Sequence, residues 1–74
     1  MKTKLLILKT NIRSKKKLQL LSPVFNGHRS IQRWSVDLED VDKVLRVETN
    51  EPIEEHEIIQ LVEKHGFYAV DLEG

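Results

Sequence analysis

The sequence lacks several residue types and runs on which common protein functions depend. None of its 74 residues is cysteine, so disulfides, thiolate metal sites and cysteine nucleophiles are excluded. The three glycines are scattered at positions 27, 66 and 74 and form no phosphate-binding loop. The apolar run near the N-terminus, Leu5–Leu8, is shorter than the roughly 7–15 residues of a signal peptide or the ~20 of a membrane span. We therefore expect a cytoplasmic protein that does not bind membranes.

Acidic residues are absent from the first 33 positions. Residues 1–33 contain nine lysines and arginines, whereas residues 34–74 contain all twelve acids and three cations. The two parts therefore carry charges of +9 and −9, although the whole chain has a formal net charge of zero. The composition, with 39% hydrophobic and 32% charged residues, is typical of a globular protein. The length predicts a single domain over residues 1–74.

The hydrophobic pattern of the first part predicts a strand, a helix and a second strand. Leu5–Leu8 is a continuous apolar run, which favours a strand inside a sheet over one at its edge. Residues 14–26 carry apolar side chains at helical spacing, namely Leu18, Leu21 and Phe25. Gly27 then ends the predicted helix. Residues 31–39 alternate as in a half-buried strand, with Trp34, Val36 and Leu38 on one side.

The second part predicts a hairpin, a helix and a last strand. A turn at residues 40–42 joins the second strand to a third around Leu45 and Val47. The second helix is expected to begin after a cap at Asn50, with Pro52 in its first turn, and to end at Gly66. Ile58, Val62 and His65 lie along one face of this helix, with Ile59 beside them, and residues 67–72 alternate again. The order βαββαβ predicts an α+β, ferredoxin-like sandwich in which two helices cover one face of a four-stranded antiparallel sheet.

Two features of the first predicted helix conflict with local rules. Lys15, Lys16 and Lys17 occupy its first turn, where the helix dipole favours anions, and together they cost about 1–3 kcal/mol at low salt. Pro23 lies inside the helix and is expected to kink or loosen it. Because such conflicts tend to fall at functional places, the three lysines form a candidate site.

Four segments together resemble heavy-metal-associated domains, the small copper-chaperone-like modules that also occur on metal-transporting ATPases. They are Lys9–Ser14, Trp34–Asp40, Lys43–Glu48 and Glu63–Ala69, in this order along almost the whole chain. The resemblance implies the same βαββαβ fold. It also implies that the loop before the first helix, with Asn11, Ile12 and Arg13, corresponds to the metal-binding loop of that family.

The chain departs from this family at the residues that hold the metal. The resemblance places Ser14 and Lys17 where the family has the two cysteines of its Cys-x-x-Cys motif. A hydroxyl is a poor ligand for a soft ion such as Cu(I), and an ammonium group is a competing cation. We therefore expect no bound metal and no cofactor. Lys17 acting as a fixed cation in place of the metal is a further possibility.

The remaining candidates are a basic cluster, one histidine and one aromatic residue. Residues Arg13, Ser14, Lys15, Lys16 and Lys17 would attract a phosphate, a carboxylate or an acidic protein, or they form a solvated charge run. His65 is the best residual metal ligand, because the turn after the second helix faces the metal loop in the family. Phe67 stands where family members have a residue that borders the metal. For His65 and Phe67 we favour a helix-end histidine and a core aromatic.

The sequence shows no catalytic constellation, so we expect no enzyme. Nucleic-acid binding is not expected either, because the first and third strands lack the aromatic residues of ferredoxin-like RNA-binding modules. The leading hypothesis is an interaction module whose basic first helix docks an acidic protein partner. The alternatives are an ACT-like sensor of small anions at the loop and first helix, and residual metal binding in metal homeostasis. The charge asymmetry also predicts weak self-association at low salt.

Overall fold

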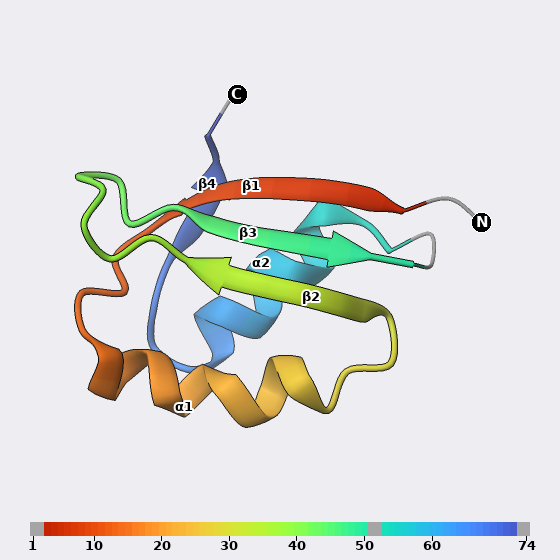
Figure 1. Cartoon of the computed structure of the whole chain (residues 1–74), viewed down its shortest axis with the longest axis horizontal. Helices are drawn as coiled ribbons and strands as arrows, with labels where there is room; N and C mark the ends of the chain where they lie inside the picture. Colours follow the sequence, from red (N-terminus) through yellow and green to blue (C-terminus); the bar gives the residue numbers. More distant parts are fainter. Residues whose placement is uncertain (1–2, 51–52, 73–74) are drawn as a thin grey trace.

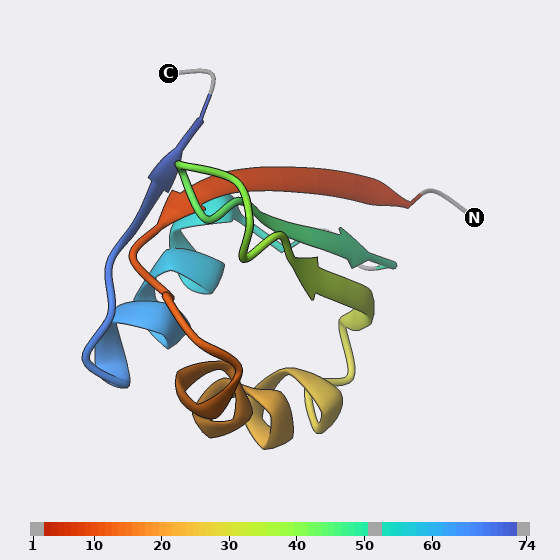
Figure 2. The same ribbon diagram turned by 60° about the vertical axis from the view of Figure 1, so that its left-hand side comes forward.

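The chain folds in the order strand, helix, strand, strand, helix, strand, over residues 3–50 and 53–72, which the computed structural model describes (Figure 1). The elements are β1 (Lys4–Thr10), α1 (Lys15–Asn26), β2 (Ile31–Val36), β3 (Leu45–Thr49), α2 (Glu55–Lys64) and β4 (Ala69–Asp71). All strand pairs are antiparallel, in the order β2-β3-β1-β4. Both helices lie on one face of the sheet (Figure 2), which confirms the predicted ferredoxin-like sandwich. Within the described ranges, neither helix is long and apolar enough to cross a bilayer.

Strand β1 lies inside the sheet, as its continuous apolar run predicts. It pairs with β3 on one side and with β4 on the other. Leu6 and Leu8 point toward the helices and are buried, whereas Leu5, on the opposite face, is 54% exposed. The alternation follows from the strand's period of two. The outer face of the sheet is therefore open, and one face alone contributes to the core.

The core fills the space between the sheet and the two helices. Its fully buried side chains include Leu8, Ile12, Leu21, Phe25, Leu45, Val47, Ile58 and Val62. Trp34 is half-buried against this cluster, and its ring meets that of Phe25 edge-on at a centroid distance of 5.1 Å. The indole Nε1–H donates to Asn26 Oδ1 at 2.8 Å, so the polar end of the ring is satisfied at the surface. These contacts fix α1 against β2.

Helix α1 begins and ends near the predicted residues. Ser14 is its N-cap and Gly27 its C-cap. The helix continues through Pro23 to Asn26, and the N–H of Gly27 donates to the carbonyl of Pro23 at 3.0 Å. Proline costs the helix one internal hydrogen bond but does not end it, because Leu21 and Phe25 on either side are held in the core.

The start of α2 differs from the prediction. The N-cap is Glu54 and not Asn50, and Pro52 lies outside the described residues. Glu57 accepts the Glu54 N–H through Oε2 at 2.8 Å, which satisfies one of the free donors at the helix start. Ile53 and Ile58 are both buried and flank this cap at the spacing of a hydrophobic staple. Burial of Ile53 therefore sets the start of the helix later than a cap at Asn50 would.

The second strand and the last strand are shorter than predicted. Strand β2 ends at Val36 because the carboxylate of Asp37 accepts the backbone N–H groups of Glu39 and Asp40, at 3.1 and 3.2 Å, and so bends the chain into a turn. The β2–β3 connection consequently spans residues 37–44, longer than the expected turn at 40–42. Strand β4 covers only Ala69–Asp71 of the expected residues 67–72.

Candidate functional site

The β1–α1 loop is anchored by two of its residues and presents the next two to solvent. Ile12 is fully buried, and its N–H donates to Thr10 Oγ1 at 3.2 Å. Asn11 Oδ1 accepts the Tyr68 N–H at 2.9 Å, which ties the loop to the segment before β4. Arg13 is exposed and Ser14 half-buried. Of the predicted site residues, Asn11 and Ile12 therefore hold the loop in place, and Arg13 and Ser14 remain accessible.

Ser14 and Lys17, which the resemblance places at the two cysteine positions, are joined by a helix cap. Ser14 Oγ accepts the backbone N–H of Lys17 at 3.2 Å. A hydroxyl engaged in this bond and an ammonium group do not make a donor set for a soft metal ion. Within residues 3–50 and 53–72, no group of three or more histidines and acids is placed to hold a metal ion. Ser14 and Lys17 therefore do not fit a soft metal ion, and the cap orders the loop instead.

The cations at the start of α1 form one exposed patch. The α1 basic patch comprises Arg13, Lys15, Lys16 and Lys17, and the first turn contains no acid. Within the part of the chain that the structure describes, their side chains make no hydrogen bond or ion pair. The structure thus gives no support to Lys17 as a cation that closes the loop. Leu20, one turn further along the helix, is 59% exposed beside this patch.

The predicted residues of the α2–β4 turn, His65 and Phe67, lie in different environments. His65 is exposed and is the C-cap of α2, which agrees with the favoured interpretation as a helix-end histidine. Its Nδ1 lies 2.8 Å from the carbonyl oxygen of Leu61, where a protonated Nδ1 donates a hydrogen bond. Phe67 is half-buried and packs against the core. Tyr68, which is not among the predicted site residues, contacts the β1–α1 loop through its backbone N–H.

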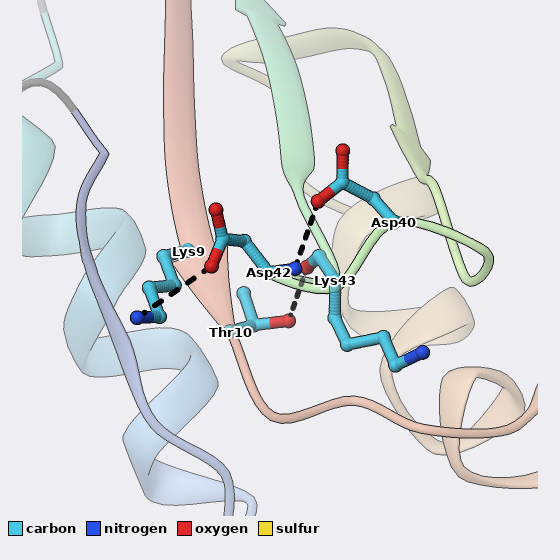
Figure 3. A network of polar contacts seen from close by, with 5 residues as sticks. All are labelled: Lys9, Thr10, Asp40, Asp42 and Lys43. Carbon is cyan, nitrogen blue, oxygen red and sulfur yellow. Dashed lines mark hydrogen bonds and ion pairs between the residues drawn. The ribbon is translucent and has the colours of Figure 1, made fainter.

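A polar network, drawn in Figure 3, joins the end of β1 to the β2–β3 loop. Lys9 Nζ lies 3.5 Å from Asp42 Oδ1, and the hydroxyl of Thr10 donates to the carbonyl of Lys43 at 2.6 Å. The backbone N–H of Thr10 donates to the carbonyl of Asp42 at 3.1 Å. Asp40 Oδ1 accepts the Asp42 N–H at 2.8 Å. Lys43 has a φ of 47°, in the left-handed region that few lysines adopt.

Beside this network lies a cavity of about 560 Å³. It is lined by Lys9, Thr10, Asn11, Arg13, Val41, Lys43 and Tyr68. Three of these residues are cationic and none is acidic. Apart from Asn11 and Arg13, they are absent from the predicted site. The lining residues come from three segments that are far apart in the sequence. The one feature of the sequence that could have indicated this site is the polar run that follows the apolar strand, beginning at Lys9.

One carboxyl group away from the loop has a perturbed pKa. Burial raises the pKa of Glu55, at the start of α2, above its ordinary value of 4.5, and the nearby carboxylate of Asp71 raises it further. Lys4 acts in the opposite direction. This pair of carboxyl groups lies between the start of α2 and the end of β4.

Comparison with known proteins supports the fold. No protein-family profile and no curated protein matches this sequence. A solved structure described as the CsoZ metallochaperone matches it with a TM-score of 0.77, over 93% of this chain and 99% of that chain, at 13% sequence identity. The resemblance to heavy-metal-associated domains is thus confirmed at the level of the fold. The fold is metallochaperone-like, in a chain without cysteine.

Proposed function

We propose that this protein is a non-catalytic interaction module that docks an acidic surface of a partner protein through the α1 basic patch. The observation that carries the proposal is the exposure of all four cations of the patch, without an acidic neighbour in the first turn of α1. At a helix N-terminus these charges oppose the dipole and destabilise the free protein. An acidic partner would offset that cost and would give the interface its charge complementarity.

The patch also has an apolar residue of the kind that interfaces bury. Leu20 lies at i+4 from Lys16 and i+3 from Lys17, so the three side chains share one face of the helix. Specific interfaces combine a small apolar centre with a polar rim. Leu20 would supply the centre and the lysines the rim. The charged rim would mainly set the association rate and its dependence on salt.

The function does not depend on a metal cargo. In heavy-metal-associated domains the loop before the first helix carries the ion, whereas here the Ser14 cap occupies that position. The α1 basic patch therefore lies next to a loop that is closed by protein atoms alone. We infer that this chain retains a docking surface of the fold and has lost metal transfer.

Affinity capture from the native cell with a charge-reversed variant tests the proposal. The variant K15E/K16E/K17E should lose the partners that the wild type captures, and binding should weaken as salt rises. Lys4, Arg29 and Arg46 are also exposed and lie outside the patch, so K4E/R29E/R46E is a control with the same change in net charge. Equal retention of partners by both variants would refute the docking surface.

A second experiment identifies the acidic side of the interface. Reversal of acids on a captured partner to lysine should restore binding to K15E/K16E/K17E and weaken binding to the wild type. Leu20→Ser should reduce affinity without changing its salt dependence, because it removes no charge. A partner whose binding responds to Leu20 alone would contradict an electrostatic docking mode.

A second copy of this chain is itself an acidic partner. The exposed acids Glu54 and Glu57 lie at the start of α2, and Asp37 and Glu39 lie in the β2–β3 loop. We expect weak self-association at low salt. About 0.5 M salt should abolish it, because salt screens the attraction between exposed charges. Sedimentation velocity of wild type and K15E/K16E/K17E at the two salt concentrations measures it. Self-association of the same strength in the variant would exclude the patch from this contact.

A further inference from the structure

We propose that the cavity between the end of β1, the β2–β3 loop and the segment before β4 binds a small polyanion with phosphate or carboxylate groups. Its volume of about 560 Å³ falls within the roughly 300–1,000 Å³ typical of small-molecule sites. It is distinct from the protein-docking surface, with which it shares only Arg13.

The charge of the lining selects an anion. Lys9, Arg13 and Lys43 line the cavity, and its lining contains no carboxylate. The adjacent Asp42 pairs with Lys9 at 3.5 Å and neutralises one of the three charges. Arg13 therefore keeps a positive charge without a counter-charge at the cavity, whereas the ammonium group of Lys43 donates to the carbonyl of Leu38 at 2.6 Å. The same lining repels metal ions.

Arg13 is the strongest anchor for such a ligand. Its side chain is exposed and, within the described residues, forms no hydrogen bond or ion pair. A guanidinium group offers paired N–H donors that match the oxygens of a phosphate or carboxylate. The donors of Arg13 are thus available to a ligand without the loss of any contact within the protein.

Neutral polar groups of the lining add directional hydrogen bonds to the attraction of its positive charges. Asn11 Oδ1 is engaged by the Tyr68 N–H, which fixes the amide and leaves its NH₂ group as a donor. The hydroxyl of Thr10 both donates to Lys43 and accepts from Ile12, so it forms part of the wall and not of the ligand shell. The ligand would therefore meet donors almost exclusively, as an oxyanion requires.

The cavity is built before any ligand arrives. Hydrogen bonds from Thr10 to Asp42 and Lys43 join β1 to the β2–β3 loop, and the bond from Tyr68 to Asn11 joins the third wall. Lys43 is held in its left-handed conformation, and its ammonium group donates to the carbonyl of Leu38 at 2.6 Å. Backbone conformations of this cost tend to be kept at sites of function. Preorganisation reduces the entropy lost when a ligand binds.

Amide chemical-shift titration of the whole chain tests the site. The probes are pyrophosphate and citrate, with sodium chloride at matched ionic strength as the reference. We expect saturable shifts at residues 9–13, 41–43 and 68, by pyrophosphate alone for a phosphate site, by citrate alone for a carboxylate site, or by both. Shifts confined to residues 14–18, or no saturation up to ~10 mM, a concentration that detects millimolar affinities, would overturn the proposal.

Two variants that each remove one positive charge test whether Arg13 itself contributes to binding. Arg13→Gln should weaken binding about tenfold, the loss expected for one charge-assisted hydrogen bond. Lys16→Gln, at an exposed position outside the cavity, should leave the affinity within about twofold. Equal losses of affinity in both variants would show that binding depends only on the overall charge of the protein, and would overturn the proposed site. K15E/K16E/K17E should lose its protein partner and still show saturable shifts in the cavity, which separates this proposal from the docking function.

Lys43→Gly supplies a second variant, without backbone strain at residue 43. Glycine adopts a φ of 47° readily, so the change removes the ammonium group and its hydrogen bond to the carbonyl of Leu38 while that φ remains favourable. We expect weaker binding of the same probe and an unchanged pattern of shifted residues. Unchanged affinity in both Arg13→Gln and Lys43→Gly would refute the cavity as the site.

Discussion

Replacement of Ser14 by alanine tests whether the β1–α1 loop is held by its own helix cap. Ser14 Oγ accepts the Lys17 N–H at 3.2 Å, and alanine leaves that donor to water. Loss of a serine cap costs about 0.5–2 kcal/mol. Because this bond is long and exposed, we expect the lower half of that range, about 0.5–1 kcal/mol. A domain of this size has a free energy of unfolding of about 4–11 kcal/mol. Each kcal/mol that is lost lowers its Tm by roughly 4–8 °C.

Aspartate at the same position distinguishes the hydrogen bond of the cap from the effect of the nearby lysine charges. The carboxylate of Ser14→Asp accepts the same N–H and adds a negative charge beside Lys15, Lys16 and Lys17, where the helix dipole also favours it. We expect a gain of about 0.3–1 kcal/mol over the wild type at low salt, which decreases at high salt. Ser14→Asn, a neutral cap, should match the wild type at both salt concentrations.

Urea unfolding followed by the fluorescence of Trp34 measures these differences. This tryptophan is the only one in the chain and packs against Phe25 in the core, so its environment changes on unfolding. The slope of free energy against urea should stay constant across the series, because no variant alters the buried core. A stability of Ser14→Ala equal to that of the wild type would refute the cap as the element that orders the loop. Equal gains for Ser14→Asp at low and high salt would refute the electrostatic cost of the lysines.

The other predictions concern the metal motif, the buried hydroxyl and the acidic pair. If Ser14 and Lys17 occupy the former cysteine positions, S14C/K17C should bind Cu(I) with a thiolate absorbance that the wild type lacks; a double variant without it would refute the alignment. Thr10→Val should cost about 1–3 kcal/mol in urea unfolding, because the buried Ile12 N–H and the partly buried Lys43 carbonyl both lose the Thr10 hydroxyl as partner, and no loss would contradict that role. The raised pKa of Glu55 means that the folded state holds the proton more tightly, so stability falls as pH rises through and above 4.5. The Tm of Glu55→Gln minus that of the wild type should therefore be larger near pH 7 than at about pH 3.5. A larger difference at pH 3.5 would show that the helix dipole dominates.

The sequence predicted the fold because its periodicities are clear and consistent. The alternation in β2 and the helical spacing of Leu21 and Phe25 assign elements that occur at almost the predicted residues. The start of α2 was harder to predict, because Asn50 is a favoured N-cap residue and Glu54 is not. The choice between them depends on the burial of Ile53, which is a property of the folded core and not of the local sequence.

The candidate site was predictable only where it is contiguous in the sequence. The α1 basic patch is a run of neighbours, so its charge conflict with the helix dipole is visible in the chain itself. The cavity has walls from residues near 10, 42 and 68, and no local pattern indicates that these positions meet. His65 continues the helical spacing of Ile58 and Val62, but the helix ends at Lys64 and the histidine is exposed.

The hydrogen bond between Ser14 and Lys17 has a thermodynamic consequence for the cell. A loop closed by a metal ion is coupled to the free concentration of that ion and to the redox state of its thiols, because binding energy adds to folding energy. A bond between two atoms of one chain contains no such concentration term. The order of this loop should therefore be the same in metal-starved, metal-loaded and oxidising conditions. On the proposed function, the docking surface would then be presented at every level of metal supply.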